Sequence, residues 1–262
     1  RPGLNALAGL VVPQMKRNSL FVVAAAGFAA LLFYWGPPAA AQAAPSLGSA
    51  QSFAVLGGTA VTVAATGTVI TGDVGVSPGT SITGIPGGGT VVPPFTTHSN
   101  DAAAIAAQTS TTALYTTLAG TGGATAIGAE LVVTLLGPGV YSFTSTANIA
   151  ATTTLTLSGD GNYIFQVGSA ITANVGSNVL LLNGASACNV FWQVTSAATL
   201  NGVSFPGMVV AQAGVTLGVG AALTGRALTT AAGAVTAAAS MIVARPTTAA
   251  KSPPGRSPIG AS

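Results

Sequence analysis

Charged side chains are scarce in this sequence. Its 262 residues include 7 Lys and Arg and 4 Asp and Glu, a charged fraction of 4%, where an ordinary soluble domain carries roughly 25%. General acid–base catalysis and carboxylate metal sites need ionisable groups, and there is only one histidine. A solenoid polysaccharide lyase or hydrolase would need its acids clustered, whereas these four are scattered. The composition therefore predicts a protein that is not an enzyme and holds no cofactor or metal.

The small excess of positive charge does not indicate a nucleic-acid partner. The formal net charge is +3, but Arg1, Lys16 and Arg17 account for it. From residue 44 onward, four cations balance four acids. Because binding to nucleic acid depends on neutralising phosphates, a neutral body predicts no such partner.

Cysteine is nearly absent as well. Cys188 is the only one, so no intrachain disulfide can form and stability must come from packing and hydrogen bonds. We expect Cys188 to be a small buried hydrophobic residue.

Long apolar runs are also missing, with one exception near the start. The run from Leu20 to Trp35 follows Met15-Lys16-Arg17 and precedes two prolines and several alanines. This order is typical of a signal peptide, predicted over residues 15–43 with cleavage after Ala41 or Ala43, behind an upstream extension at 1–14. An uncleaved membrane anchor is the alternative. No later stretch approaches the ~20 apolar residues of a spanning helix.

The remainder divides into a domain and a tail. Residues 245–262 combine Pro, Ser and three cations with almost no large apolar side chain, which predicts a disordered tail. Residues 44–244 are long enough to form one domain with a substantial core. We therefore predict a secreted, extracellular, monomeric protein without membrane association after cleavage.

Four segments of the domain repeat a common pattern. They are residues 170–174, 197–201, 214–218 and 234–238, and each has threonine at its third position. A repeat of roughly 20 residues built from short β-type runs indicates a β-solenoid, in which each coil stacks on the next.

Alternation along each strand assigns the two sides of these repeats. The inward set is Ile171, Ala173, Ala198, Leu200, Val215, Leu217, Val235 and Ala237. The outward set contains Thr172, Thr199, Thr216 and Thr236, preceded by Ala170, Ala197, Gly214 and Ala234 and followed by Asn174, Asn201, Gly218 and Ala238. Residues 60–64 repeat the pattern and add Thr62. The surface carrying these five threonines, here called the threonine face, is small and uncharged.

A second strand in each coil is bulky at successive positions, as in residues 163–167, 190–194, 208–212 and 226–229. Such strands are buried on both sides, so something must cover them. The best helix candidate spans about residues 101–119, with Ser99 or Asn100 as N-cap and Gly120 at its end. We expect its apolar side, Ile105, Leu114, Tyr115 and Leu118, to contact these strands.

Several single residues have local structural interpretations. We expect His98 to be an exposed loop residue, and Asp73 and Asp160 to form turns. Arg226 is expected to cap a loop or pair with an acid. Phe165 and Trp192 are expected in the core.

Seven blocks, taken in order, resemble the secreted ice-binding (antifreeze) proteins of microbes. The blocks are residues 47–56, 70–84, 100–108, 137–143, 163–172, 183–194 and 223–228. The resemblance implies a mainly β fold: a right-handed, three-faced, discontinuous β-solenoid with one long helix packed along one face. It also implies that the amino-terminal coil docks beside the last coil, which would set Thr62 next to Thr236. Proteins of this kind bind ice through a flat face that the helix does not cover, without cofactor or reaction.

The threonine face suits that function physically. Stacked strands lie about 4.8 Å apart, and alternate residues along a strand lie about 6.6 Å apart, which are plausible matches to ice. The threonine side chain is stiff because it is branched at Cβ. Its hydroxyl can hydrogen-bond to a water molecule, and its methyl group orders the neighbouring water. We therefore predict ice adsorption, thermal hysteresis and inhibition of recrystallisation through this face.

Two alternatives remain open from the residues alone. The outward side of the third strand, including Thr154, Thr156 and Thr224, is a rival ice face. An extracellular adhesive or cell-envelope structural solenoid is a rival function, for which we would expect exposed Trp or Tyr.

Overall fold

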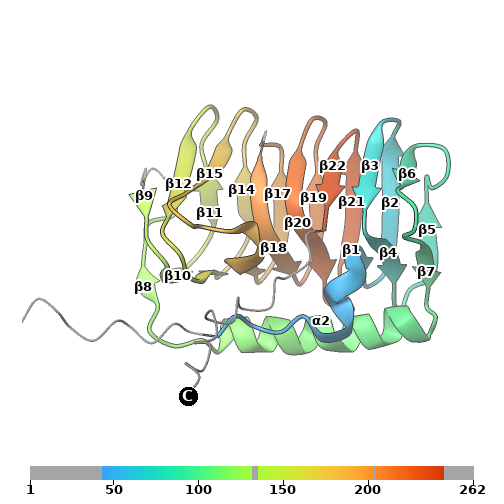
Figure 1. Ribbon diagram of the computed structural model, residues 1–262, viewed down its shortest axis with the longest axis horizontal. Helices are drawn as coiled ribbons and strands as arrows, with labels where there is room; N and C mark the ends of the chain where they lie inside the picture. Colours follow the sequence, from blue (N-terminus) through green and yellow to red (C-terminus); the bar gives the residue numbers. More distant parts are fainter. Residues whose placement is uncertain (1–42, 132–134, 203, 245–262) are drawn as a thin grey trace, which may run out of the picture. The chain divides into compact units, whose positions relative to one another are not determined.

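The computed structural model describes residues 43–131, 135–202 and 204–244. There the chain winds into coils of short parallel strands, with one long helix running along their side (Figure 1). The predicted upstream extension, tail and signal peptide, apart from residue 43, lie outside the described residues.

Each coil contributes strands to three faces. The helix face contains β8 (Thr125–Ala126), β10 (Gly139–Phe143), β13 (Tyr163–Val167), β16 (Val190–Val194), the carboxy-terminal parts of β18 (Phe205–Ala211) and β20 (Ala222–Thr229), β1 (Phe53–Gly57), β4 (Asp73–Val76) and β7 (Thr97–Ser99). The threonine face contains β11 (Ala147–Ile149), β14 (Ile171–Ala173), β17 (Ala197–Leu200), β19 (Gly214–Leu217), β21 (Ala234–Ala238), β2 (Ala60–Ala65) and β5 (Ser81–Thr83). The third face contains β9 (Leu135–Leu136), β12 (Thr154–Ser158), β15 (Asn178–Leu182), the amino-terminal parts of β18 and β20, β22 (Met241–Val243), β3 (Thr68–Thr71) and β6 (Gly89–Val91).

The order of the strands in space is discontinuous in sequence. β1 lies between β20 and β4, β2 lies between β21 and β5, and β3 lies between β22 and β6. The amino-terminal segment therefore docks against the last coil on all three faces. The expected neighbours Thr62 and Thr236 are paired in register, which confirms that part of the prediction.

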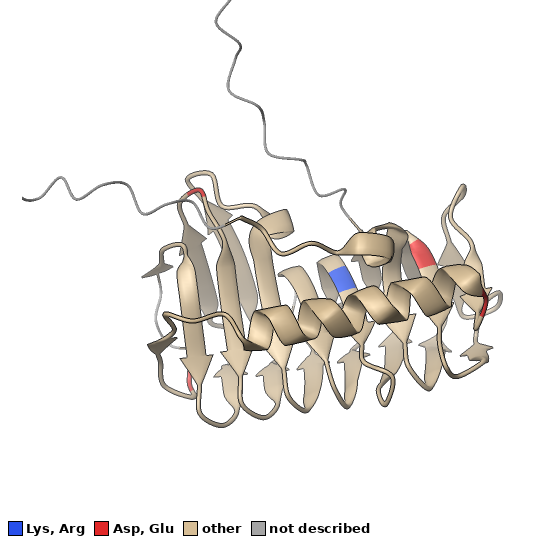
Figure 2. Cartoon of the chain, turned by 90° about the horizontal axis from the view of Figure 1, so that it is seen from below, with Lys and Arg blue, Asp and Glu red and all other residues tan. Residues whose placement is uncertain are grey.

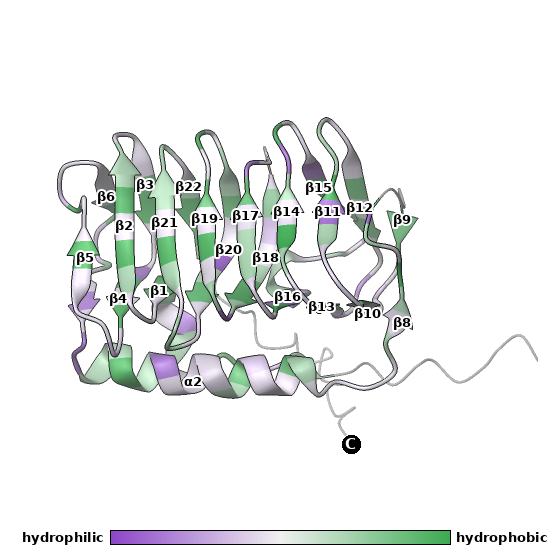
Figure 3. Ribbon diagram, turned by 180° about the vertical axis from the view of Figure 1, so that it is seen from behind, coloured by the Kyte–Doolittle hydropathy of each residue, from purple (hydrophilic) through white to green (hydrophobic). Residues whose placement is uncertain are grey.

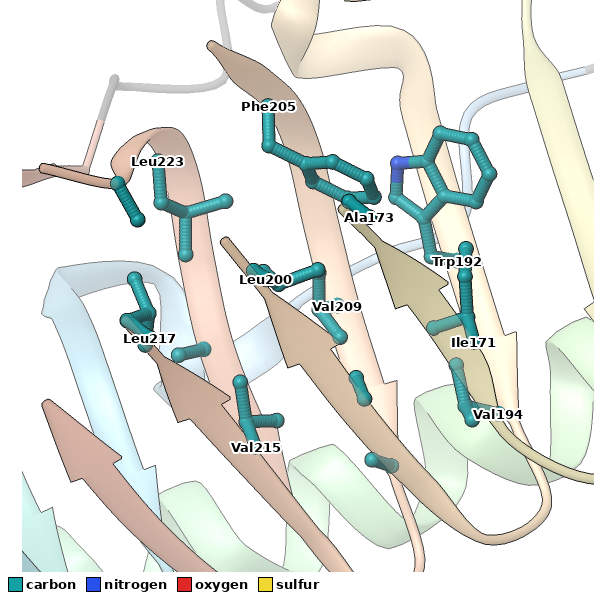
Figure 4. Close-up of a cluster of buried hydrophobic side chains, with 14 of the residues drawn as sticks. Ile171, Ala173, Trp192, Val194, Leu200, Phe205, Val209, Val215, Leu217 and Leu223 are labelled. Atoms are coloured by element: carbon teal, nitrogen blue, oxygen red, sulfur yellow. The ribbon is translucent and has the colours of Figure 1, made fainter. Parts of the chain in front are cut away.

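The interior of the solenoid is filled from all three faces. All eight residues predicted to point inward from the threonine face are buried, as are Phe165 and Trp192. Figure 4 shows several of them meeting Trp192, Val209 and Phe205 from the opposite strands. Aromatic rings stack from coil to coil, with centroids 5.5 Å apart between Tyr141 and Phe165 and 4.0 Å apart between Phe165 and Trp192. The alternation therefore assigned the eight inward side chains of the threonine face correctly.

The helix α2 (Ala102–Ala119) follows the predicted bounds, but its N-cap was predicted wrongly. Asp101 is the cap, because its Oδ1 accepts a 2.9 Å hydrogen bond from the Ala104 amide. This bond, with a smaller contribution from His98, lowers the pKa of the Asp101 carboxyl. Asn100 instead adopts a left-handed backbone conformation, and its amide bonds to Val76. No helix in the described part of the chain is long and apolar enough to cross a membrane.

The buried side of α2 also differs from the prediction. Leu114 and Leu118 are buried against the helix face as expected, and Tyr115 packs at the margin of this cluster. Ile105, however, is 49% exposed. The contact is made instead by the smaller or polar residues Ala104, Ala107, Gln108 and Thr111. Short side chains let the helix approach the strands closely, so an apolar stripe of large residues is not needed.

A short amino-terminal turn, η1 (Gly48–Ser52), lies beside α2. The Ser49 amide donates to Ser110 Oγ on the helix at 3.1 Å. Beneath η1, the buried Arg226 donates from Nη2 to the Gln51 carbonyl at 2.5 Å. The loop-capping role predicted for Arg226 is therefore present.

Three other expectations about single residues were wrong. Asp73 does not form a turn, because it is the first residue of β4 and accepts a 3.0 Å hydrogen bond from the amide of Thr96. His98 is half-buried on β7, with its ring 5.3 Å from that of Phe53 and Nδ1 2.7 Å from Asp101 Oδ2. Cys188 is half-buried and not part of the core, because it lies in the short turn η2 (Ala187–Asn189).

A side chain at Gly225 should destabilise the folded solenoid. β18 and β20 pass from the third face to the helix face near Gly207 and Gly225, which are paired. A Cβ at position 225 would lie 1.8 Å from the Gly207 carbonyl oxygen. Because the obstacle is backbone, we expect Gly225→Ala to cost more than the ~3 kcal/mol of ordinary overpacking, measured by denaturant unfolding. Gly122→Ala, where a Cβ would meet nothing within 4 Å, is the matched control; equal stability of the two variants would contradict this account.

Candidate functional site

The threonines predicted to share a surface do share one. Across the seven-stranded sheet, Thr172, Thr199, Thr216, Thr236 and Thr62 are paired in register from strand to strand. Each points outward because its neighbours along the strand are buried. Figure 3 looks onto these strands from β5 to β11. The structure thus brings all five residues into one row.

A row of very small residues runs beside the threonines. Ala197, Gly214, Ala234 and Ala60 are paired in register on adjacent strands. Ala170 directly precedes β14, and its carbonyl accepts a 2.9 Å hydrogen bond from the Ala147 amide. With methyl groups or a hydrogen at these positions, nothing in this row rises beside the threonines, so the surface is level.

Sequence reasoning missed a sixth threonine. Thr83 on β5 is paired with Thr62 and is exposed. Its hydroxyl donates to Thr62 Oγ1 at 3.4 Å. The segment Ser81-Ile82-Thr83 has the same alternation as Ala60-Val61-Thr62, so the signal was present in the sequence. We define the threonine row as Thr62, Thr83, Thr172, Thr199, Thr216 and Thr236.

Amides and one acid border the threonine row at the opposite edge of the sheet. Asn148 is paired with Thr172, and its side-chain nitrogen donates to Glu130 Oε2 at 2.7 Å. Its side-chain oxygen accepts a 2.6 Å bond from Asn174. Both the nitrogen and the oxygen of the Asn148 side chain are therefore hydrogen-bonded. At this edge of the sheet the threonine row is followed by an asparagine and then by a glutamate.

The third outward row, formed by Asn174, Asn201, Gly218 and Ala238, also lies flat. The oxygen of the Asn201 side chain occupies the space above Gly218, where it would be only 2.1 Å from an added Cβ. Asn174, which precedes Asn201 in this row, bonds to the Ile149 carbonyl at 3.0 Å as well as to Asn148. These amides therefore follow the sheet and do not project from it.

The rival third face is less regular. Thr156 is paired with Leu135 and Leu180, whereas Thr154 is paired with Asn178 and Thr224 with Pro206 and Val243. Leu135 is 59% exposed, Leu180 41% and Met241 51%. Between β15 and β18 the regular pairing reduces to a single bridge, where a hollow lies. The structure therefore does not bring Thr154, Thr156 and Thr224 into one row.

The acids of the domain are far apart (Figure 2), and three of them serve local structure. Asp73 accepts from the Thr96 amide at 3.0 Å, Asp101 caps α2, and Glu130 holds Asn148. Among the residues that the structure describes, no group of three or more His, Cys, Asp or Glu could hold a metal ion. In the described residues, the threonine face is a flat surface whose one charged neighbour is Glu130, at its edge.

Comparison with known proteins identifies the family of this chain. Residues 55–243 match the model of the ice-binding-like family. The chain is 36% identical to an ice-binding protein of Nostoc sp. (strain HG1), over 70% of this chain and 68% of that protein. It is 32% identical to ice-binding protein K3-B1 of Typhula ishikariensis, over 68% and 81% of the two chains. It is also similar to the crystal structure of an ice-binding protein from an Antarctic biological consortium, with a TM-score of 0.73, 38% identity and coverage of 79% and 93%. The chain therefore belongs to the ice-binding-like family.

Proposed function

We propose that this protein binds ice crystals through the threonine face. The observation that carries the proposal is the threonine row, in which six outward threonines follow one another on six adjacent strands in register. Ice presents a regular, uncharged array of oxygens, so a binder needs a rigid repeating surface. Parallel strands supply a repeat of about 4.8 Å across the sheet.

The chemistry of the face supports water ordering. Each hydroxyl can bond to one or more waters, and β-branching restricts the side chain. The buried valine, isoleucine, leucine and alanine side chains beneath the row hold the strands rigid, because a closely packed interior resists deformation. A charged side chain would retain its own hydration shell against the lattice, and the described part of this face carries only Glu130, at its edge.

Adsorption to the crystal would act outside the cell without any reaction. Bound protein blocks the advance of ice between adsorbed molecules, which gives thermal hysteresis and inhibits recrystallisation. The pattern at residues 15–43 supports export by a cleaved signal peptide, and the relatives named above are called ice-binding proteins. We propose a secreted monomer whose partner is the ice surface.

Ice-affinity partitioning tests the proposal directly. A hemisphere of ice is grown slowly from a dilute solution that also contains an unrelated soluble protein of similar size. We expect this protein to be enriched in the ice, whereas the unrelated protein stays in the liquid. Exclusion of both proteins from the ice would refute the proposed function.

The adhesive alternative has less support. Recognition of sugars commonly uses exposed aromatic rings, and the large hydrophobic residues exposed in the described part of the chain are all aliphatic or methionine. Trp192 is fully buried. The most exposed aromatic side chains in these residues, Phe95, Tyr115 and Tyr141, are partly buried, which makes them poorer platforms for stacking sugar rings.

A further inference from the structure

The threonine row is assembled from two separate parts of the chain. Thr172, Thr199, Thr216 and Thr236 follow one another through successive coils, whereas Thr62 and Thr83 come from the amino-terminal segment. No coil of chain connects Thr236 to Thr62. Their alignment therefore depends on non-covalent contacts where β21 meets β2, a boundary that we call the seam.

Strand pairing alone specifies the seam weakly. Both strands present alternating small residues, Ala60-Val61-Thr62-Val63-Ala64 against Ala234-Val235-Thr236-Ala237-Ala238. A slip of one residue would turn the threonine inward. A slip of two that places Thr62 opposite Ala234 would instead bring Val63 opposite Val235 and keep the inward positions apolar. Burial along β2 and β21 therefore does not by itself select the observed register, and contacts outside these two strands must contribute.

A buried hydroxyl lies at the corner of the seam. Thr229, at the end of β20, is 0% exposed. Its Oγ1 accepts a 2.9 Å hydrogen bond from the Gly58 amide, in the turn between β1 and β2. The same oxygen lies 3.0 Å from the Gly233 carbonyl and 3.3 Å from the Leu56 carbonyl. Having one proton, it donates to one of these carbonyls at a time.

Other contacts converge on the same corner. The Gly233 carbonyl accepts from the amides of Gly58 at 2.8 Å and Thr59 at 2.9 Å. The Thr229 carbonyl accepts from Gln108 Nε2 of α2 at 2.9 Å. The last coil, the amino-terminal segment and the helix therefore meet at Thr229. Its partners Gly58 and Gly233 lie only a few residues before Thr62 and Thr236 along the chain.

We propose that Thr229 is a positioning residue for ice binding, whose hydroxyl sets the register of β2 on β21 and so aligns Thr62 and Thr83 with the other four threonines. The proposal rests on the proposed function of the threonine face. It predicts that the hydroxyl matters for activity only through the two amino-terminal threonines, since the other four are aligned by their own coils.

A mutant cycle in the full-length chain tests this dependence. Thr229→Val keeps the shape and removes the hydroxyl. We expect it to lower thermal hysteresis to the level of the double variant T62A/T83A, and to cause no further loss when added to that variant. Added to T172A/T199A, it should lower the activity further. Thr229→Ser, which keeps the hydroxyl, should retain wild-type activity.

A matched control separates this role from general loss of packing. Thr111 is also 0% exposed, and its Oγ1 has no hydrogen-bond partner, so Thr111→Val should leave thermal hysteresis unchanged. If Thr229→Val does not fold by circular dichroism, Thr59→Val removes an exposed hydroxyl that donates to the same Gly233 carbonyl at 3.3 Å. Thr59→Val should lower thermal hysteresis in the same backgrounds as Thr229→Val, but by a smaller amount.

Three results would overturn the inference: full activity of the folded Thr229→Val variant, an equal further loss in both backgrounds, or, where that variant does not fold, full activity of Thr59→Val. Failure of the proposed function looks different. In that case the wild-type protein is excluded from ice or, if another face binds the crystal, Thr216→Tyr leaves ice binding intact, whatever happens at Thr229.

Discussion

Replacing Thr216 with tyrosine should abolish thermal hysteresis while the protein stays folded. Thr216 is exposed near the middle of the threonine row, paired with Thr199 on one side and Thr236 on the other. A tyrosine ring would stand above the level surface that Gly214 and the neighbouring alanines leave. The lattice could then touch few of the threonines at once. Thr199→Tyr should have the same effect for the same reason.

The measurement is thermal hysteresis at several protein concentrations, with thermal unfolding followed by circular dichroism to establish folding. Thr154→Tyr is the matched control, because Thr154 is an exposed strand threonine on the third face. It should retain full activity. The opposite result, activity lost at Thr154 and kept at Thr216, would assign ice binding to the third face.

Replacing Trp192 with alanine should cause the largest loss of stability among core substitutions. The indole stacks on Phe165, with centroids 4.0 Å apart, and lies 4.8 Å from the Phe205 ring. Its Nε1 donates to the Pro206 carbonyl at 3.1 Å. Truncating a fully buried tryptophan typically costs about 3–5 kcal/mol. Here we expect the upper end of that range, because a hydrogen bond and two ring contacts are lost together.

Denaturant unfolding at equilibrium measures the change, with Trp192→Phe as the control. Phenylalanine keeps a ring between Phe165 and Phe205 but leaves the Pro206 carbonyl without this donor, so its loss should be smaller. Equal stability of Trp192→Ala and the wild type would show that the stacked rings do not hold adjacent coils together.

Regular alternation explains what the sequence could predict about the fold. The inward set beneath the threonine face was assigned correctly because a strand has a period of two and burial follows it strictly. The same reasoning placed the threonines from residue 172 onward. Thr83 was missed because the alternation there covers only Ser81-Ile82-Thr83 before Gly84 interrupts it, whereas residues 170–174 carry the full five-residue pattern.

Tertiary contacts explain what could not be predicted. The pairing of Thr62 with Thr236 joins residues far apart in sequence, and only the family resemblance anticipated it. The buried positions of α2 depend on how closely the helix approaches the strands, which favours Ala104 and Thr111 over Ile105. Likewise, the cap at Asp101 depends on the turn at Asn100.

The seam has a consequence for how the domain can be attached to something else. Because the first and last segments meet in the middle of the solenoid, η1 lies beside α2 and β22 ends on the third face. Neither end of the described domain emerges from the threonine face or from the edge strands β5 and β11. A fusion partner or a solid support joined at either end would therefore leave the whole threonine row open to a crystal.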